Sequence, residues 1–269
     1  MGADLYPNAP LRFVAFEARF PQAPSFTATV PPEHLRRALR HRFPRNEVAS
    51  VQSLEIGPGA VRQGAETRHR FMTKDRTMSV TLGAQTLIVE TTSYVQFERF
   101  RDTIEEVASA VERLDEVSGL LRVGLRFIDE VRLPVAVTAL NQWAAYVDPS
   151  LTSAVGLVPG SPLQLVGMIE TTIAEQRSLV MRYGAQPRGR IVDPNGPLRI
   201  PHDDPEDQPL FFIDIDSCWT SPEDDLPPFD TTTILGICNE LHVPTREVFE
   251  SSITEKLRQD VFRAERSSR

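Results

Sequence analysis

The sequence predicts an α+β protein in which antiparallel strands pack on long helices, and three observations support this class. Short runs rich in Val, Ile, Thr and Phe are separated by Gly, Pro and Asp breaks typical of hairpins. The order of the predicted elements occurs twice along the chain. A stripe of apolar residues at spacings of three and four predicts a long amphipathic helix, formed by Phe97, Phe100, Ile104, Val107, Val111 and Leu114.

The composition is that of a folded protein. The chain has 269 residues, of which 41% are hydrophobic and 25% charged, enough for one large domain or two smaller modules. Cys218 and Cys238 have no His or Cys cluster around them, which favours buried thiols over a disulfide or a zinc site. No window approaches the ~18 apolar residues of a membrane span, and residues 1–10 lack a signal-peptide pattern. We therefore expect a cytoplasmic protein without a membrane partner.

The first strand motif returns in the second half. Leu11-Arg12-Phe13-Val14 reappears as Leu125-Arg126-Phe127-Ile128, 114 residues later. Each copy predicts a strand stopped by a proline. Each is followed by a stretch compatible with a short helix, at 32–43 and 138–147.

The remaining elements follow in the same order in both halves. In the first half, Met78, Val80 and Leu82 alternate with polar residues, so one sheet face should be buried under the long helix. The long helix has too few heptads to favour a coiled coil. In the second half, helical sequence runs from Thr231 to Phe262, where Pro244 should break or kink it. The further predicted strands lie near 48–56, 67–73, 77–82, 86–92, 163–174, 177–184 and 210–220.

This order of strand, helix, antiparallel strands and long helix resembles the helix-grip arrangement of TATA-binding-protein-like domains. We expect two tandem modules, residues 1–120 and 121–269, each with a curved antiparallel sheet on a long helix. The modules should pack as one pseudo-two-fold unit whose second sheet face is open.

Three landmarks resemble a sporadically distributed family of uncharacterised bacterial proteins of about this length. They are Tyr6-Pro7-Asn8-Ala9-Pro10, Tyr94 with Phe97 and Phe100, and Gly124 to Asp129. Phe127 and Asp129 stand where that family commonly has Tyr and Asn. The resemblance implies a bacterial cytoplasmic protein with no known catalytic residues, and it suits an accessory or defence-associated gene.

Charge is unevenly distributed. Residues 1–120 hold 15 Lys/Arg and 15 Asp/Glu, so the net charge of −8 belongs to the second half. An acidic half disfavours nucleic acid, whose non-specific affinity comes mainly from Lys and Arg. The one basic run favours a solvated helix face over a phosphate site, and it consists of Arg36, Arg37, Arg40, Arg42 and Arg45 with His34 and His41. The acidic stretches 203–207 and 223–225 predict exposed loops and lack a calcium-loop spacing.

The candidate site residues lie on predicted strands of the second half. Asp214 and Asp216 share one strand face, roughly 7 Å apart, near enough to share a cation or divide acid and base roles. Neighbouring strands can add charged partners, and a cross-strand charge ladder on a solvated face is the simpler interpretation. The candidate binding residues are Arg126, Glu170, Arg182, Asp214 and Asp216.

No catalytic or cofactor motif is present, so we assign no catalytic residue, metal or cofactor. His69 is expected on a strand surface and His242 at a helix end. The segment 156–160 is expected to form a linker turn. Arg12 and Arg126 should occupy equivalent places, with Arg126 held in a carboxylate network and Arg12 either more loosely or differently paired.

Three functions remain open. The first is a non-enzymatic protein-interaction or scaffold module whose partner is a protein, including a second copy of the chain. The second is a nucleic-acid-binding module that uses Arg36–Arg45. The third is a metal-dependent hydrolase built on Asp214 and Asp216.

Overall fold

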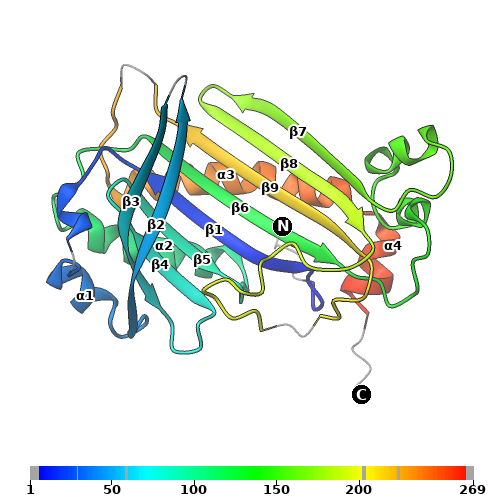
Figure 1. The fold of residues 1–269 in the computed structure, drawn as a ribbon, viewed down its shortest axis with the longest axis horizontal. Helices are drawn as coiled ribbons and strands as arrows, with labels where there is room; N and C mark the ends of the chain where they lie inside the picture. The colour runs from blue at the N-terminus through cyan, green and yellow to red at the C-terminus, as the bar shows by residue number, and fades with distance from the viewer. Residues whose placement is uncertain (1–5, 29, 58–59, 202–203, 223–224, 265–269) are drawn as a thin grey trace.

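The computed structural model describes residues 6–28, 30–57, 60–201, 204–222 and 225–264 (Figure 1). The fold is α+β, with one antiparallel sheet of nine strands in the order β2-β3-β4-β5-β1-β6-β9-β8-β7. The strands are β1 (Leu11–Arg19), β2 (Arg45–Gly57), β3 (Ala60–Met72), β4 (Met78–Leu82), β5 (Thr86–Thr91), β6 (Arg122–Val131), β7 (Leu165–Ala174), β8 (Arg177–Gln186) and β9 (Leu210–Thr220).

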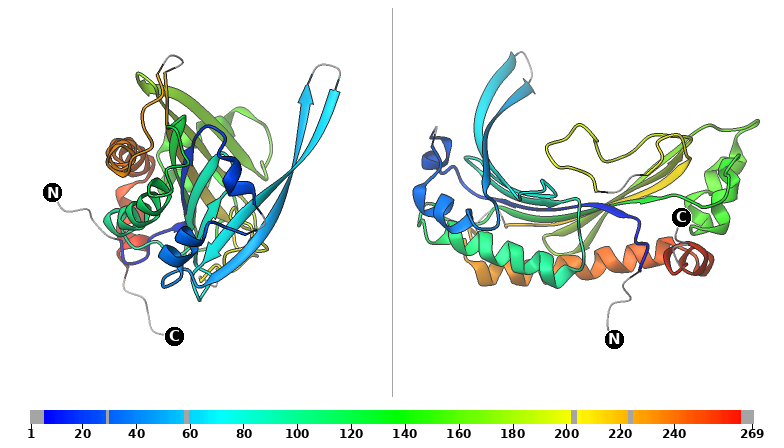
Figure 2. Two further views of the ribbon diagram at one scale, coloured as in Figure 1. Left: turned by 90° about the vertical axis from the view of Figure 1, so that its left-hand side faces the viewer. Right: turned by 90° about the horizontal axis from the view of Figure 1, so that it is seen from below.

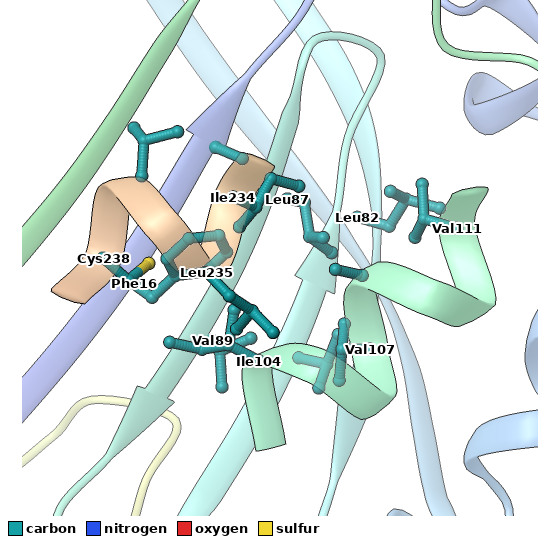
Figure 3. Close-up of a cluster of buried hydrophobic side chains, with 14 of the residues drawn as sticks. Phe16, Leu82, Leu87, Val89, Ile104, Val107, Val111, Ile234, Leu235 and Cys238 are labelled. Carbon is teal, nitrogen blue, oxygen red and sulfur yellow. The ribbon is translucent and has the colours of Figure 1, made fainter. Parts of the chain in front are cut away.

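Helices cover one face of this sheet. Helices α2 (Phe97–Glu112) and α3 (Thr231–Ser252) run along the same side of the strands, as Figure 2 shows. The predicted stripe of α2 is confirmed, because Ile104, Val107 and Val111 are fully buried. They pack with strand residues such as Phe16 and Val89 and with α3 residues such as Cys238 (Figure 3).

A second apolar cluster lies under the other end of the sheet. Trp143 and Phe211 pack with ring centroids 5.6 Å apart, and Leu257 and Phe262 belong to the same cluster. The helix expected over 138–147 is instead the 3₁₀ helix η2 (Leu140–Ala145), and it is followed by η3 (Pro149–Leu151) and η4 (Ser153–Leu157). Pro149 and Gly156 disfavour a longer α-helix there.

The break expected at Pro244 is wrong. Helix α3 continues through Pro244 to Ser252. The proline removes only one hydrogen bond, and Thr245 Oγ1 donates to the Leu241 carbonyl at 2.9 Å in the same turn. The chain leaves the helix at Ile253, which pairs with Val147 as an isolated bridge, and resumes as α4 (Glu255–Leu257) and η5 (Arg258–Phe262).

The sheet crosses the predicted module boundary. β1 and β6 pair directly at its centre, with Ala15 opposite Arg126, so residues 1–120 and 121–269 share one sheet. The short helix α1 (Glu33–Leu39) lies in the first half. Within the described residues, no helix has the length and apolar character that crossing a membrane requires.

Candidate functional site

The five candidate residues lie on one sheet face, opposite the helices. Directly opposed residues in an antiparallel pair point to the same side. One row across the sheet runs Ala15, Arg126, Asp216, Val180 and Glu170, and the next row runs Phe13, Ile128, Asp214, Arg182 and Met168. The strand order therefore brings together residues from β6, β7, β8 and β9.

Arg126 and Asp214 form the centre of this site. Arg126 Nε and Nη2 donate to the two carboxylate oxygens of Asp214 at 2.8 and 2.7 Å. Arg182 Nη1 lies 3.7 Å from Asp214 Oδ2. The Asp214 side chain is only 4% exposed, whereas Arg126 is 42% exposed. The hydrogen bond to Asp214 raises the pKa of Arg126. The expected carboxylate network of Arg126 is thus present.

Asp216 and Glu170 behave differently. Burial raises the pKa of Asp216, although Arg122 Nη2 lies 3.6 Å from its carboxylate. Glu170 is exposed on β7 and stands two strands away from Asp216. Asp216 and Glu170 thus differ in burial, and an Arg side chain lies near Asp216. This arrangement suits recognition of a charged surface better than binding of a shared cation.

A groove of about 290 Å³ lies beside these residues on the open face. Its floor includes Phe13, Ala15 and Ile88, and its charged wall includes Glu17, Arg19, Glu90, Arg122, Arg126 and Asp216. Burial raises the pKa of Glu90, while the hydrogen bond from Ser79 Oγ at 3.1 Å lowers it. The groove thus combines an apolar floor with charges of both signs.

Arg122 and Glu17 are site residues that the sequence reasoning missed. Arg122 Nη1 lies 3.7 Å from Glu17, and its guanidinium lies over Gly124, where a Cβ would come within 2.8 Å of Nη1. The signal was available, because Arg122 is four residues before Arg126 on the same strand and so shares its face.

Arg12 is paired differently from Arg126, which is one of the two expected outcomes, and it is not loosely held. It donates through Nε and Nη2 to Asp204 at 2.6 and 3.2 Å and is 12% exposed. A register shift between Leu11 and Phe13 changes the facing of this strand. Phe13 lies in the regular part of the strand, opposite Ile128, and lines the groove, whereas Phe127 is buried beneath the helices. The two Leu-Arg-Phe motifs are therefore not equivalent in orientation.

The acidic stretches are only partly as expected. Asp204 is paired with Arg12 rather than free in solvent, while residues 205–207 are exposed. Asp203, Glu223 and Asp224 lie outside the described residues. Among the described residues, no group of three or more His, Cys, Asp or Glu side chains could hold a metal ion.

The basic run is largely engaged within the protein. Arg36 and Arg37 pair with Glu33, Arg42 donates to Glu106 and Thr103, and Arg45 donates to the Lys74 carbonyl. These contacts leave less free positive charge for a phosphate backbone.

Both histidine expectations are wrong. His69 is fully buried, and its Nε2 lies 2.8 Å from the Ala28 carbonyl oxygen. His242 lies within α3 and stacks on Phe97 with ring centroids 3.8 Å apart, and burial lowers its pKa to about 4. Neither faces the open side of the sheet.

The fold and site define an α+β protein with one helix-covered sheet face and one open face that carries an Arg–carboxylate network. No protein-family model matches the chain, and no curated protein sequence matches it.

We expect Arg126→Met to lower the free energy of unfolding by about 1–3 kcal/mol, because it leaves Asp214 buried with only Arg182 nearby. The matched control is Arg12→Met. Its partner Asp204 is 19% exposed on a connecting segment and can turn to solvent, so we expect a smaller loss. Urea unfolding of both variants measures the difference. If Arg12→Met lowers the free energy of unfolding as much as Arg126→Met or more, this account is contradicted.

Proposed function

We propose that the chain is a non-enzymatic protein-interaction or scaffold module that binds its partner on the open sheet face. The observation that supports this proposal is the network around Asp214. Arg126 and Arg182 are both partly exposed there, while the carboxylate that holds them is buried. A buried anchor that fixes exposed guanidinium groups prepares them to bind carboxylates of a partner without losing side-chain freedom.

The groove beside the network fits the same proposal. Its apolar floor of Phe13, Ala15 and Ile88 can take a partner's apolar side chain, and its charged wall can fix the orientation. The occupant that matches it is an extended segment of a protein with charges of both signs. The resemblance to an uncharacterised bacterial family supports a cytoplasmic role in an accessory or defence-associated system.

We also propose that the sheet is built from two helix-grip units. The order of strands supports this, because β1 and β6 pair at the centre, each half extends outward from them, and each half ends in a long helix. The pseudo-two-fold arrangement would place the groove near the junction of the two units.

Site-specific photo-crosslinking in the native bacterial host tests the interaction proposal. The crosslinker replaces Val180, which lies between Asp216 and Glu170 on the open face, or Val243, which is 54% exposed on α3. We expect an adduct with a protein from position 180 that Arg182→Glu weakens, and none from position 243. Equal adducts from both positions, or none from position 180, would contradict the proposal.

A further inference from the structure

Strand β7 is an edge of the sheet and is unusually apolar for an edge. It pairs only with β8 and is exposed on both of its faces (Figure 1). Val166 and Met168 are 63% and 62% exposed on the open side, and Ile169 is 49% exposed on the other. Single exposed apolar residues are ordinary, but several on one edge mark an interaction surface.

The backbone of β7 is equally available. An edge strand presents a row of unpaired N–H and C=O groups, and proteins usually protect such an edge with Lys, Pro, bulges or short length. β7 has ten residues, contains neither Lys nor Pro, and carries Glu170 as its one charge; its one irregularity against β8 lies near its end, between Thr172 and Ala174. The other edge, β2, carries Arg45 and Glu47 in its first three residues. β7 is therefore the edge suited to pairing.

We infer that a second copy of this chain covers β7, with the two β7 strands paired antiparallel about a two-fold axis at Ile169. This inference rests on the proposed interaction function and names one of its partners. The pairing would continue the sheet from one copy into the other and would give hydrogen-bond partners to the free edge of both β7 strands at once.

The side chains favour this register over the two adjacent ones. Opposed residues must share a sheet face, so the axis falls on a residue of β7. With the axis at Ile169, this residue meets the partner's Ile169. An axis at Glu170 would set two carboxylates directly opposite each other, which is destabilising. An axis at Met168 would set Ile169 against the partner's Gly167 and lose the apolar pair.

Charge complementarity supports the same arrangement. In this register Met168 lies opposite the partner's Glu170, and Met168 is itself opposite Arg182 on β8. Arg182 and the partner's Glu170 would then be two strand spacings apart, about 10 Å between Cα atoms, within reach of two long side chains. Arg182 is 40% exposed and only 3.7 Å from Asp214, and Glu170 forms no ion pair with another described residue. Arg182 of each copy can therefore form an ion pair with Glu170 of the other copy.

Light scattering during size-exclusion chromatography of the full chain tests the dimer. We expect the wild type to be dimeric at micromolar concentration and Ile169→Lys to be monomeric, because it places two ammonium groups on the axis. The matched control is Val48→Lys, which changes a residue 55% exposed on the other edge strand and should leave the dimer intact. Circular dichroism verifies that both variants fold. A monomeric wild type, or a dimer that survives Ile169→Lys, overturns the inference.

Cysteine crosslinking tests the register. Opposed residues in an antiparallel pair have Cα atoms about 4.5–5.5 Å apart, a distance that a disulfide can span. Mild oxidation should join two copies of Ile169→Cys, whereas Glu170→Cys, which faces Met168, should remain largely unlinked. The wild type, with Cys218 and Cys238, gives the background. Equal crosslinking of the two variants overturns the register. Photo-crosslinking from position 180 tests the open face separately from β7. A monomeric wild type would therefore overturn the dimer only, and the photo-crosslinking result would still decide the proposed function.

Discussion

Asp129→Asn is expected to stabilise the protein above neutral pH. Asp129 lies on β6 opposite Leu11 and Ile213, and its side chain is fully enclosed. Burial raises the pKa of this carboxyl to about 8, with Asp214 raising it further and Arg12 opposing the shift. The folded state therefore keeps a proton that the unfolded chain releases near pH 4.

The sign of the effect follows from this proton. Stabilisation by the protonated carboxyl is complete below its unfolded pKa and is lost as the pH rises to about 8, at about 1.4 kcal/mol per pH unit. Asn has a similar shape and no charge to bury. Near pH 4 the free energy of unfolding of Asp129→Asn should equal that of the wild type. At pH 8 it should be higher by a few kcal/mol, because the wild type has by then lost the stabilisation from its protonated carboxyl.

Urea unfolding from pH 4 to pH 9 measures this difference, with the exposed Asp102→Asn as control. The quantity to compare is the difference between wild type and Asp129→Asn at each pH. Glu90 and Asp216 also have raised pKa values, and their contribution to the pH dependence is common to both proteins. A constant difference between wild type and Asp129→Asn across this range would show that Asp129 is ionised in the folded state.

Local patterns in the sequence are sufficient for most elements of the sheet. Alternation places Val80 and Leu82 inside, and the spacing of three and four places Ile104 and Val107 on the buried stripe of α2. These patterns succeed because each residue's environment depends on its position relative to a single large buried face.

The errors arise where tertiary contacts override the local pattern. Pro244 remains within α3 because the packing of that helix outweighs the roughly 3 kcal/mol that a proline costs in a helix interior. His69 is expected at the surface because Arg68 and Arg70 flank it, yet its ring is buried and its Nε2 lies 2.8 Å from the Ala28 carbonyl oxygen. Arg12 changes its orientation because of a register shift that no sequence spacing reveals.

The candidate site shows the same division. Facing could be predicted for Arg126, Asp214 and Asp216, because it depends only on strand alternation. The contribution of the segment 187–201 could not be predicted, because it depends on long-range contacts. Arg76 and Arg199 illustrate this: the Arg199 N–H donates to the Arg76 carbonyl at 2.8 Å, from positions far apart in the sequence.

The last prediction concerns the residue that fixes this segment to the sheet. Glu130 lies on the open face of β6, and its side chain is only 2% exposed. Its Oε1 accepts hydrogen bonds from the backbone N–H groups of Ile191 and Val192 at 2.6 and 3.0 Å, and Arg132 lies 3.4 Å from Oε2. One carboxylate thus satisfies two backbone donors of the segment and one buried guanidinium.

Glu130→Ala should lower the free energy of unfolding by about 3 kcal/mol, because two backbone N–H groups lose their acceptor and the buried Arg132 guanidinium, which keeps two carbonyl partners, loses its carboxylate. Glu130→Gln keeps one acceptor oxygen and should lose less, and the exposed Glu175→Ala should change little. Urea unfolding gives the global effect, and hydrogen exchange at the Ile191 and Val192 amides gives the local one. If Glu130→Ala retains both the stability and the protection of these amides, then the apolar contacts of the segment, rather than this carboxylate, hold it on the sheet.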